Sequence, residues 1–114
     1  MAKSELSPVI KPSPQVVRWD ITDTSAQPVH VFGHNLNFFT VFYICRSGSA
    51  TVTLQASPDG NTFVTVPNSQ TNLDAATTPA ALKTFSLSVH SLYPVLSNPS
   101  GTINISVFVI ATRP

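Results

Sequence analysis

The sequence predicts an all-β protein, an antiparallel β-sandwich of about eight strands with jelly-roll or Greek-key connections. Three observations support this class. Apolar and polar residues alternate with a period of two, the apolar runs are short and separated by turn residues, and no long run keeps a helical period. The chain has 114 residues, which is the usual length of one domain. We therefore expect a single β-sandwich domain over residues 15–114.

Residues 1–14 differ in composition from the rest of the chain. Pro8, Pro12 and Pro14 lie close together among Ser, Lys and Glu residues. Proline removes a backbone N–H and fixes one backbone dihedral, so this spacing excludes both a helix and a central strand. We expect an extended N-terminal arm over residues 1–14, which either frays or lies along a neighbouring subunit.

Two runs alternate most clearly. In residues 15–21, the side chains of Val17, Trp19 and Ile21 fall on one face of the expected strand. Residues 49–57 alternate in the same way, and the Ser-Pro-Asp-Gly-Asn turn that follows predicts a hairpin with residues 63–66. Further short strands are expected at residues 29–32, 82–90 and 92–96, the last at an edge or corner because it contains Pro94.

Two other expected strands, residues 36–45 and 101–111, carry apolar residues on both faces, the second of them in its C-terminal half. A sandwich core covers only one face of a strand, so the second face calls for the arm, a loop or another subunit. This excess of apolar surface predicts an assembly interface. The residues expected to form it are Pro8, Val9, Ile10, Pro12, Phe39, Val41, Tyr43, Phe108 and Ile110.

The composition narrows the classes of partner. Charged residues make up 10% of the chain, against roughly 25% in a typical soluble domain. So low a charge weakens the repulsion between copies and favours self-association. The net charge is +1 and the basic residues occur singly, which argues against nucleic acid as a partner. The sequence has neither a secretory signal nor a long apolar span, so we expect synthesis in the cytoplasm and no membrane partner.

Residues that could carry chemistry are few and scattered. Asp20 and Asp23 flank a strand end, where turn formation explains them better than acid-base catalysis. His30 and His34 lack a nearby Cys, Asp or Glu that would complete a metal site. Cys45 is the only cysteine, and it is either a buried thiol or one half of an intermolecular disulfide. We expect no enzyme activity, no cofactor and no small-molecule substrate.

The long polar segment of residues 67–79 is expected to be a loop that crosses between sheets or that has a function of its own. A carbohydrate-binding or other ligand-binding module remains a minor alternative for the whole domain. That alternative would use this loop or the side chain of Trp19.

Residues 50–66 (ATVTLQASPDGNTFVTV), residues 85–95 (FSLSVHSLYPV) and the final alternating strand resemble small β-sandwich proteins of phage virions. This resemblance implies a capsid-decoration, head-accessory or tail-associated subunit. The sequence is also similar to self-assembling fibre or spore-appendage subunits, whose N-terminal arm contacts the next subunit. The cysteine-rich arm of some of those subunits is missing here, which leaves covalent cross-linking without support.

Together these observations predict a non-enzymatic structural subunit of a virion, which assembles through its arm and its exposed apolar strand faces. Its partners would be copies of itself and other structural proteins of the same assembly. The alternative is a subunit of an extracellular fibre on a cell or spore surface, built by exchange of arms or strands.

Overall fold

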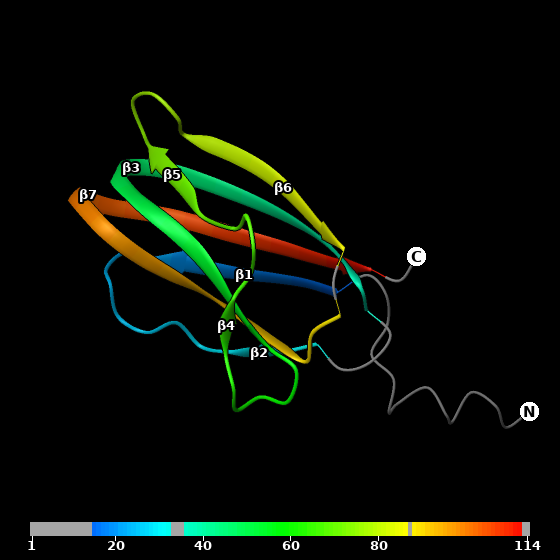
Figure 1. Cartoon of the computed structure of the whole chain (residues 1–114). Helices are drawn as coiled ribbons and strands as arrows, with labels where there is room; N and C mark the ends of the chain where they lie inside the picture. Colours follow the sequence, from blue (N-terminus) through cyan, green and yellow to red (C-terminus); the bar gives the residue numbers. More distant parts are fainter. Residues whose placement is uncertain (1–14, 33–35, 87, 113–114) are drawn as a thin grey trace, which may run out of the picture.

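Two long strands form the centre of the molecule. The structure, a computed structural model, describes residues 15–32, 36–86 and 88–112. Within these residues, seven strands form one open antiparallel sheet. Its central strands are β3 (Phe38–Ser57), with 20 residues, and β7 (Ser91–Thr112), with 22. They pair from Phe38 with Thr112 to Ser57 with Ser91, with three register shifts on the way, and they lie side by side in Figure 1.

The five shorter strands pair with the outer edges of this central pair. β1 (Gln15–Ile21) and β2 (His30–Val31) pair with β7. The other three pair with β3, and they are β4 (Val64–Thr65), β5 (Thr71–Asp74) and β6 (Ala80–Ser86). We call β1, β6 and residues 38–45 and 105–112 the first half of the sheet. The second half comprises β2, β4, β5 and residues 49–57 and 91–100.

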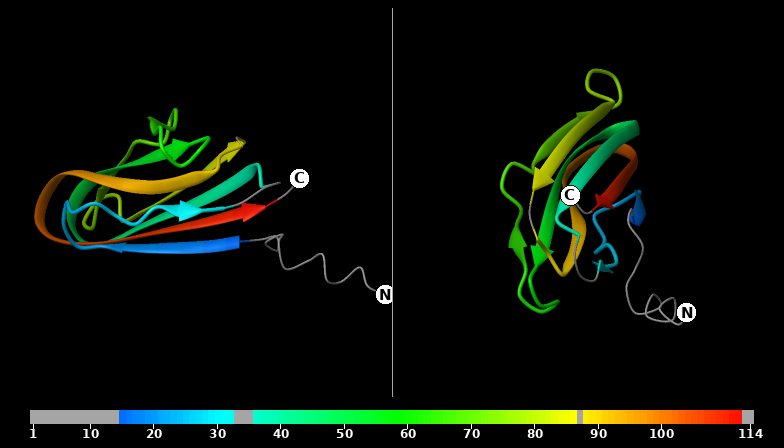
Figure 2. Two further views of the ribbon diagram at one scale, coloured as in Figure 1. Left: turned by 90° about the horizontal axis from the view of Figure 1, so that it is seen from below. Right: turned by 90° about the vertical axis from the view of Figure 1, so that its right-hand side faces the viewer.

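Both central strands bend where the two halves meet. The register between β3 and β7 shifts three times between Cys45 and Thr51. Gly48 and Gly101 lie in this region with φ values of 73° and 78°, a conformation that glycine adopts without steric cost. The bend brings the second half of the sheet back over the first, so that each central strand curves round at one end of the molecule (Figure 2).

The core lies between the two halves. Along the two central strands, alternate residues point inward and are mostly buried. Phe39 and Phe85 of the first half line the same narrow apolar gap as Leu54 and Leu92 of the second half. The buried apolar residues that form this core are Trp19, Ile21, Phe32, Leu36, Phe39, Val41, Tyr43, Cys45, Ala50, Val52, Leu54, Ala56, Val66, Leu73, Phe85, Leu92, Leu96, Ile103, Ile105, Val107, Val109 and Ala111.

The structure confirms the all-β prediction and the strand over residues 15–21, and its described residues form seven strands where about eight were expected. Residues 36–45 and 49–57 belong to one strand, β3, and residues 92–96 and 101–111 belong to another, β7. Gly48 at a bulge resembles a glycine in a turn, and residues 97–100 (SNPS) resemble a turn in composition, which is why the sequence suggested a break at each bend. The jelly-roll or Greek-key order stays a prediction, and the N-terminal arm lies outside the described residues.

Pro94 was expected at an edge or corner, and in the structure it pairs on one side only, with Leu54 of β3. On the other side of β7, β2 pairs only with Ser91 and Leu92. Pro94 therefore lies beyond the end of β2. A strand can accommodate a proline where no neighbouring strand requires its N–H.

Residues 67–79 are not a free loop, because they contain β5. One buried and two exposed hydrogen bonds hold the segment that leads into this strand. Tyr43 Oη donates a hydrogen bond to the carbonyl of Ser69 (3.3 Å), and Lys83 Nζ donates to the carbonyls of Asn68 and Gln70 (2.9 and 2.8 Å). Burial raises the pKa of Tyr43 to about 12. Tyr43 in the core and Lys83 on β6 therefore fix the position of this segment.

The two glycines at the bend provide a matched pair of substitutions. A Cβ atom at Gly48 would lie 2.7 Å from the carbonyl oxygen of Thr102 and 2.8 Å from that of Ser100. At Gly101, the nearest atom to such a Cβ would be 3.6 Å away. Gly48→Ala should therefore lower the free energy of unfolding by about 3 kcal/mol, and Gly101→Ala by about 1 kcal/mol through backbone strain alone. Urea denaturation measures both, and equal losses would contradict this account of the bend.

Candidate assembly surface

The outward side of the first half of the sheet carries a continuous group of large apolar side chains. The register places Phe108, Phe42 and Leu82 in one row across β7, β3 and β6. Ile110 and Val16 are paired in the neighbouring row. We call this surface the outer apolar face, and its residues are Val16, Phe38, Phe42, Leu82, Phe108 and Ile110.

These side chains are exposed to different degrees. Val16 and Leu82, on the two edge strands, are 65% and 58% exposed, while Phe38 and Phe42 are 39% and 38% exposed. Phe108 and Ile110 are half-buried between them. Isolated apolar residues are normal on protein surfaces, but a contiguous group marks a surface that another molecule covers. The outer apolar face is therefore the best candidate for a functional surface.

A polar network borders this face. Arg46 Nη1 donates a hydrogen bond to Ser106 Oγ (2.6 Å), and Ser106 Oγ donates to Asp20 Oδ1 (2.6 Å). Arg18 Nε also donates to Asp20 Oδ1 (2.9 Å), and its guanidinium carbon lies 5.0 Å from the centre of the Phe108 ring. The hydrogen bond from Ser106, followed by that from Arg18, lowers the pKa of Asp20. Arg18 and Asp20 thus form an ion pair beside the apolar face, and Ser106 links Arg46 to the same carboxylate.

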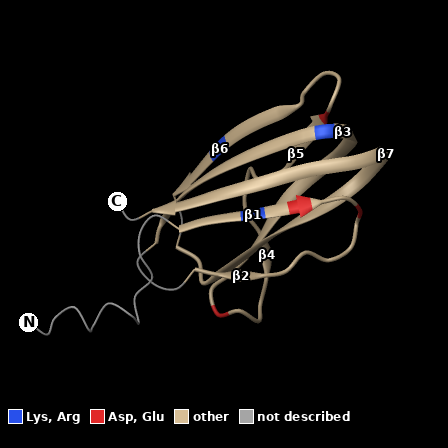
Figure 3. Ribbon diagram, turned by 180° about the vertical axis from the view of Figure 1, so that it is seen from behind, with Lys and Arg blue, Asp and Glu red and all other residues tan. Residues whose placement is uncertain are grey.

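Charges are sparse over the rest of the described chain. Figure 3 shows the Lys, Arg, Asp and Glu residues as short segments of the ribbon that do not gather in one region. An interaction that depends on strong opposite charge is therefore not favoured on this surface.

The residues predicted from the sequence occupy two environments. Phe39, Val41 and Tyr43 point into the core and are at most 1% exposed, so they are not part of the surface of this chain. Phe108 and Ile110 lie on the outer apolar face. The remaining residues, Pro8, Val9, Ile10 and Pro12, lie outside the described residues. A role in assembly stays a prediction for the whole set.

Sequence reasoning missed Val16, Phe38, Phe42 and Leu82 as surface residues. The alternation in β1 could have found the two phenylalanines only together with the register of β1, β7 and β3, which the structure provides. Trp19 faces the core and pairs with Val107, which in turn pairs with Tyr43. Residues in register share a face, so the inward side of β1 determines the inward side of β3.

The candidates for chemistry do not form a site. The described part of the chain contains no group of three or more His, Cys, Asp or Glu residues that could hold a metal ion. Burial raises the pKa of the Cys45 thiol, which disfavours the reactive thiolate. Asp23 accepts a hydrogen bond from the backbone N–H of Ser25, as expected for a turn residue. Among the described residues there is also no helix with the length and hydropathy of a membrane span.

The chain shares its fold with a prophage protein. The crystal structure of the SPBc2 prophage-derived protein YomS superposes with a TM-score of 0.58 at 13% sequence identity, over 90% of this chain and 98% of that chain. A protein of Bacillus endospore appendages, which form disulfide-linked pili, aligns with a TM-score of 0.44 at 14% identity, over 90% and 93% of the two chains. No family model matches the sequence, and no curated protein matches it.

The polar network makes a prediction about pH. The folded-state pKa of Asp20 lies below its ordinary value of 3.8, so its contribution to stability is present above that pH and is lost as the pH falls through the folded value. Asp20→Asn should therefore reduce the loss of stability on acidification. Urea denaturation of both proteins at a series of pH values below 6 measures this. If the free energy of unfolding fell equally with pH in the two proteins, the ionised Asp20 would contribute nothing to the pH dependence of stability.

Proposed function

We propose that this chain is a non-enzymatic structural subunit of a virion, in a capsid-decoration, head-accessory or tail-associated position. In this proposal it associates with copies of itself through the outer apolar face. The observation that carries the proposal is the contiguous apolar surface formed by Phe42, Leu82 and Phe108 with their neighbours. The fold shared with a prophage-derived protein supports the choice of a phage particle over other assemblies.

A second copy of the chain is the occupant that fits this face best. The only charges on the outward side of β1, those of Arg18 and Asp20, already pair with each other, so the face does not demand a partner of opposite charge. The small net charge of +1 causes little repulsion between copies. Two such faces packed against each other would cover apolar side chains from both copies in an isologous contact.

The N-terminal segment adds a second contact in this proposal. Residues 1–14 precede Gln15, which begins an edge strand, and Val16 of the outer apolar face follows directly. Pro8, Val9, Ile10 and Pro12 can therefore reach the same surface on a neighbouring copy as an arm attached to the domain formed by residues 15–114. Other structural proteins of the particle would bind where copies of this chain leave the apolar surface open.

Substitutions on the outer apolar face should weaken self-association. The double variant Phe42→Ser with Leu82→Ser removes two large exposed side chains from one row and should weaken association at least about tenfold. Val64→Ser is the matched control, because Val64 is 62% exposed but belongs to β4 in the second half of the sheet. Sedimentation velocity at micromolar concentrations gives the oligomeric state, and urea denaturation verifies that each variant is folded.

The expected result is an oligomer for the wild type and for Val64→Ser, and a monomer for the double variant. A wild-type protein that stays monomeric at roughly 50 µM would contradict the proposal. An equal loss of association in Val64→Ser would also contradict it, because the contact would then not depend on this face.

The edges of the sheet favour a fibre subunit as the second candidate function. In the described part of the chain, β1 pairs only with β7 and β6 pairs only with β3, so each has one unpaired edge. Both strands have seven residues. Pairing of β1 in one copy with β6 in the next would be a heterologous contact, and repetition of it would build a filament.

Negative-stain electron microscopy of the purified protein distinguishes these two functions. Closed oligomers are expected for the virion subunit, because an isologous contact between outer faces does not propagate. Filaments would favour the fibre subunit. Thr84→Pro, in the middle of β6, should then shorten the filaments, since proline cannot donate to an added strand.

A further inference from the structure

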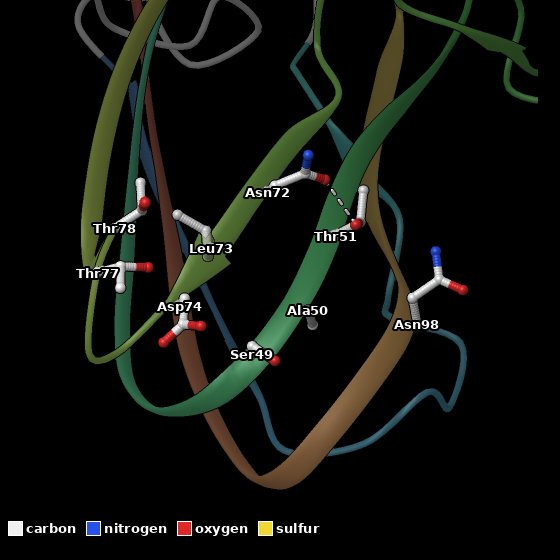
Figure 4. A pocket seen from close by; sticks show the side chains of 9 residues that line it. All are labelled: Ser49, Ala50, Thr51, Asn72, Leu73, Asp74, Thr77, Thr78 and Asn98. Atoms are coloured by element: carbon white, nitrogen blue, oxygen red, sulfur yellow. Dashed lines mark hydrogen bonds between the residues drawn. The ribbon is translucent and has the colours of Figure 1, made fainter.

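A polar cavity of about 320 Å³ lies beside the bend of the sheet. Such a volume falls within the range of small-ligand sites. Its lining comes from β3, β5, the turn after β5, and Asn98 on β7 (Figure 4). Gln15 and Ala111 pair at the other end of the first half, so the cavity and the ends of the described chain lie at opposite ends of the molecule (Figure 1).

Strand alternation makes the cavity polar. Ser49 pairs with Asp74, and Thr51 pairs with Asn72, so the register sets four polar side chains in two adjacent rows. The residues between them, such as Ala50 and Leu73, point inward and are buried in the core. Thr77 and Thr78, in the turn after β5, add two hydroxyl groups beside the Ser49–Asp74 row.

Hydrogen bonds hold the walls of the cavity in place. The N–H of Thr78 donates to the carbonyl of Asp74 (2.8 Å), and the N–H of Ala75 donates to the carbonyl of Gly48 at the bend (3.0 Å). Asp74 Oδ1 accepts the N–H of Ala76 (2.8 Å), and Thr51 Oγ1 donates to Asn72 Oδ1 (2.8 Å). The polar groups are thus preorganised, which reduces the entropy that a ligand would lose on binding.

The chemistry of the lining restricts the class of ligand. No Lys, Arg or His is among the described residues that form the cavity, so an anion would meet only the repulsion of Asp74. A divalent cation prefers several carboxylate or carbonyl ligands, and Asp74 is the only carboxylate in this lining. The two apolar lining residues, Ala50 and Leu73, are buried, and the other seven lining residues are polar.

A neutral molecule with many hydroxyl groups complements a lining of neighbouring hydroxyl, amide and carboxylate groups. A hydroxyl group of such a molecule can donate to Asp74 Oδ2 and accept from the amide of Asn72 or the hydroxyl of Thr78. We infer that the cavity lined by Ser49, Thr51, Asn72, Asp74, Thr77 and Thr78 is a carbohydrate-binding site. The inference goes beyond the proposed structural role, since it assigns a ligand to the end of the molecule opposite the ends of the described chain.

The lining lacks an aromatic ring among its described residues, so a single site should bind sugars weakly, with a dissociation constant on the order of 1 mM. Weak sites become effective when many copies present them together, because each further contact forms at a high effective concentration. A subunit that occurs in many copies therefore needs only a weak carbohydrate site.

The test is an NMR titration of ¹⁵N-labelled protein with glucose, galactose and N-acetylglucosamine. The Phe42→Ser/Leu82→Ser variant is titrated in parallel, so that binding is measured independently of self-association. Shift changes are expected at the amides of residues 49–51 and 72–78. Asp74→Asn should weaken binding about tenfold, because it removes the charge and keeps an oxygen for the N–H of Ala76.

Asp59→Asn is the matched control. Asp59 Oδ1 accepts the N–H of Asn61 in a turn (2.8 Å), as Asp74 does for Ala76, but it lies outside the cavity. This variant should bind as the wild type does. Asn72→Ala gives a second measurement at the cavity if Asp74→Asn is poorly folded.

Three results would overturn the inference. They are the absence of shifts with all three sugars at roughly 50 mM, sugar-induced shifts that Asp74→Asn and Asn72→Ala leave unchanged, and a response of these amides to calcium chloride alone. None of these results bears on self-association, which sedimentation measures separately.

Discussion

The fold depends on the pairing of β3 with β7 along their full length. Every other strand pairs with one of these two, so the central ladder sets the position of all seven described strands. The bulges near Gly48 and Gly101 then allow the ladder to bend between its two halves. A straight ladder of this length would leave one face of each long strand without a core. The bend gives both halves a shared interior, which is where Phe39 and Leu54 meet.

The same bend separates two outward surfaces of different character. On the first half, the alternation in β3 and β7 places Phe42 and Phe108 outside, bordered by a paired set of charges. Beside the bend on the second half, it places Thr51 and Asp74 outside, around a polar cavity. One side is suited to association with another protein surface and the other to a hydrated ligand. Strand period and register alone account for this division.

Local patterns predicted much of the secondary structure. The strand over residues 15–21 and the hairpin after Ser57 follow from alternation and from turn residues, which act over a few positions. The continuity of β3 through Gly48 could not be predicted, because a glycine with positive φ is compatible with a turn and with a bulge. The surface residues of β3 could not be predicted from the sequence either. A strand with apolar residues on both faces does not show which face is buried, and only its register with β7 decides between Phe39 and Phe42.

The length of the central ladder also has a kinetic consequence. Its pairs range from Ser57 with Ser91 to Phe38 with Thr112, which are 74 positions apart in the sequence. Closing the shortest loop first costs the least entropy, so the ladder should form from the Ser57 end toward Phe38. Until that process reaches residues 38–45, the first half of the sheet has no central pair, so Phe108, Ile110 and the β1 strand that pairs with β7 are not yet in place beside Phe42. The surface that we assign to assembly is therefore completed last, which limits contact between chains whose second half has not yet folded.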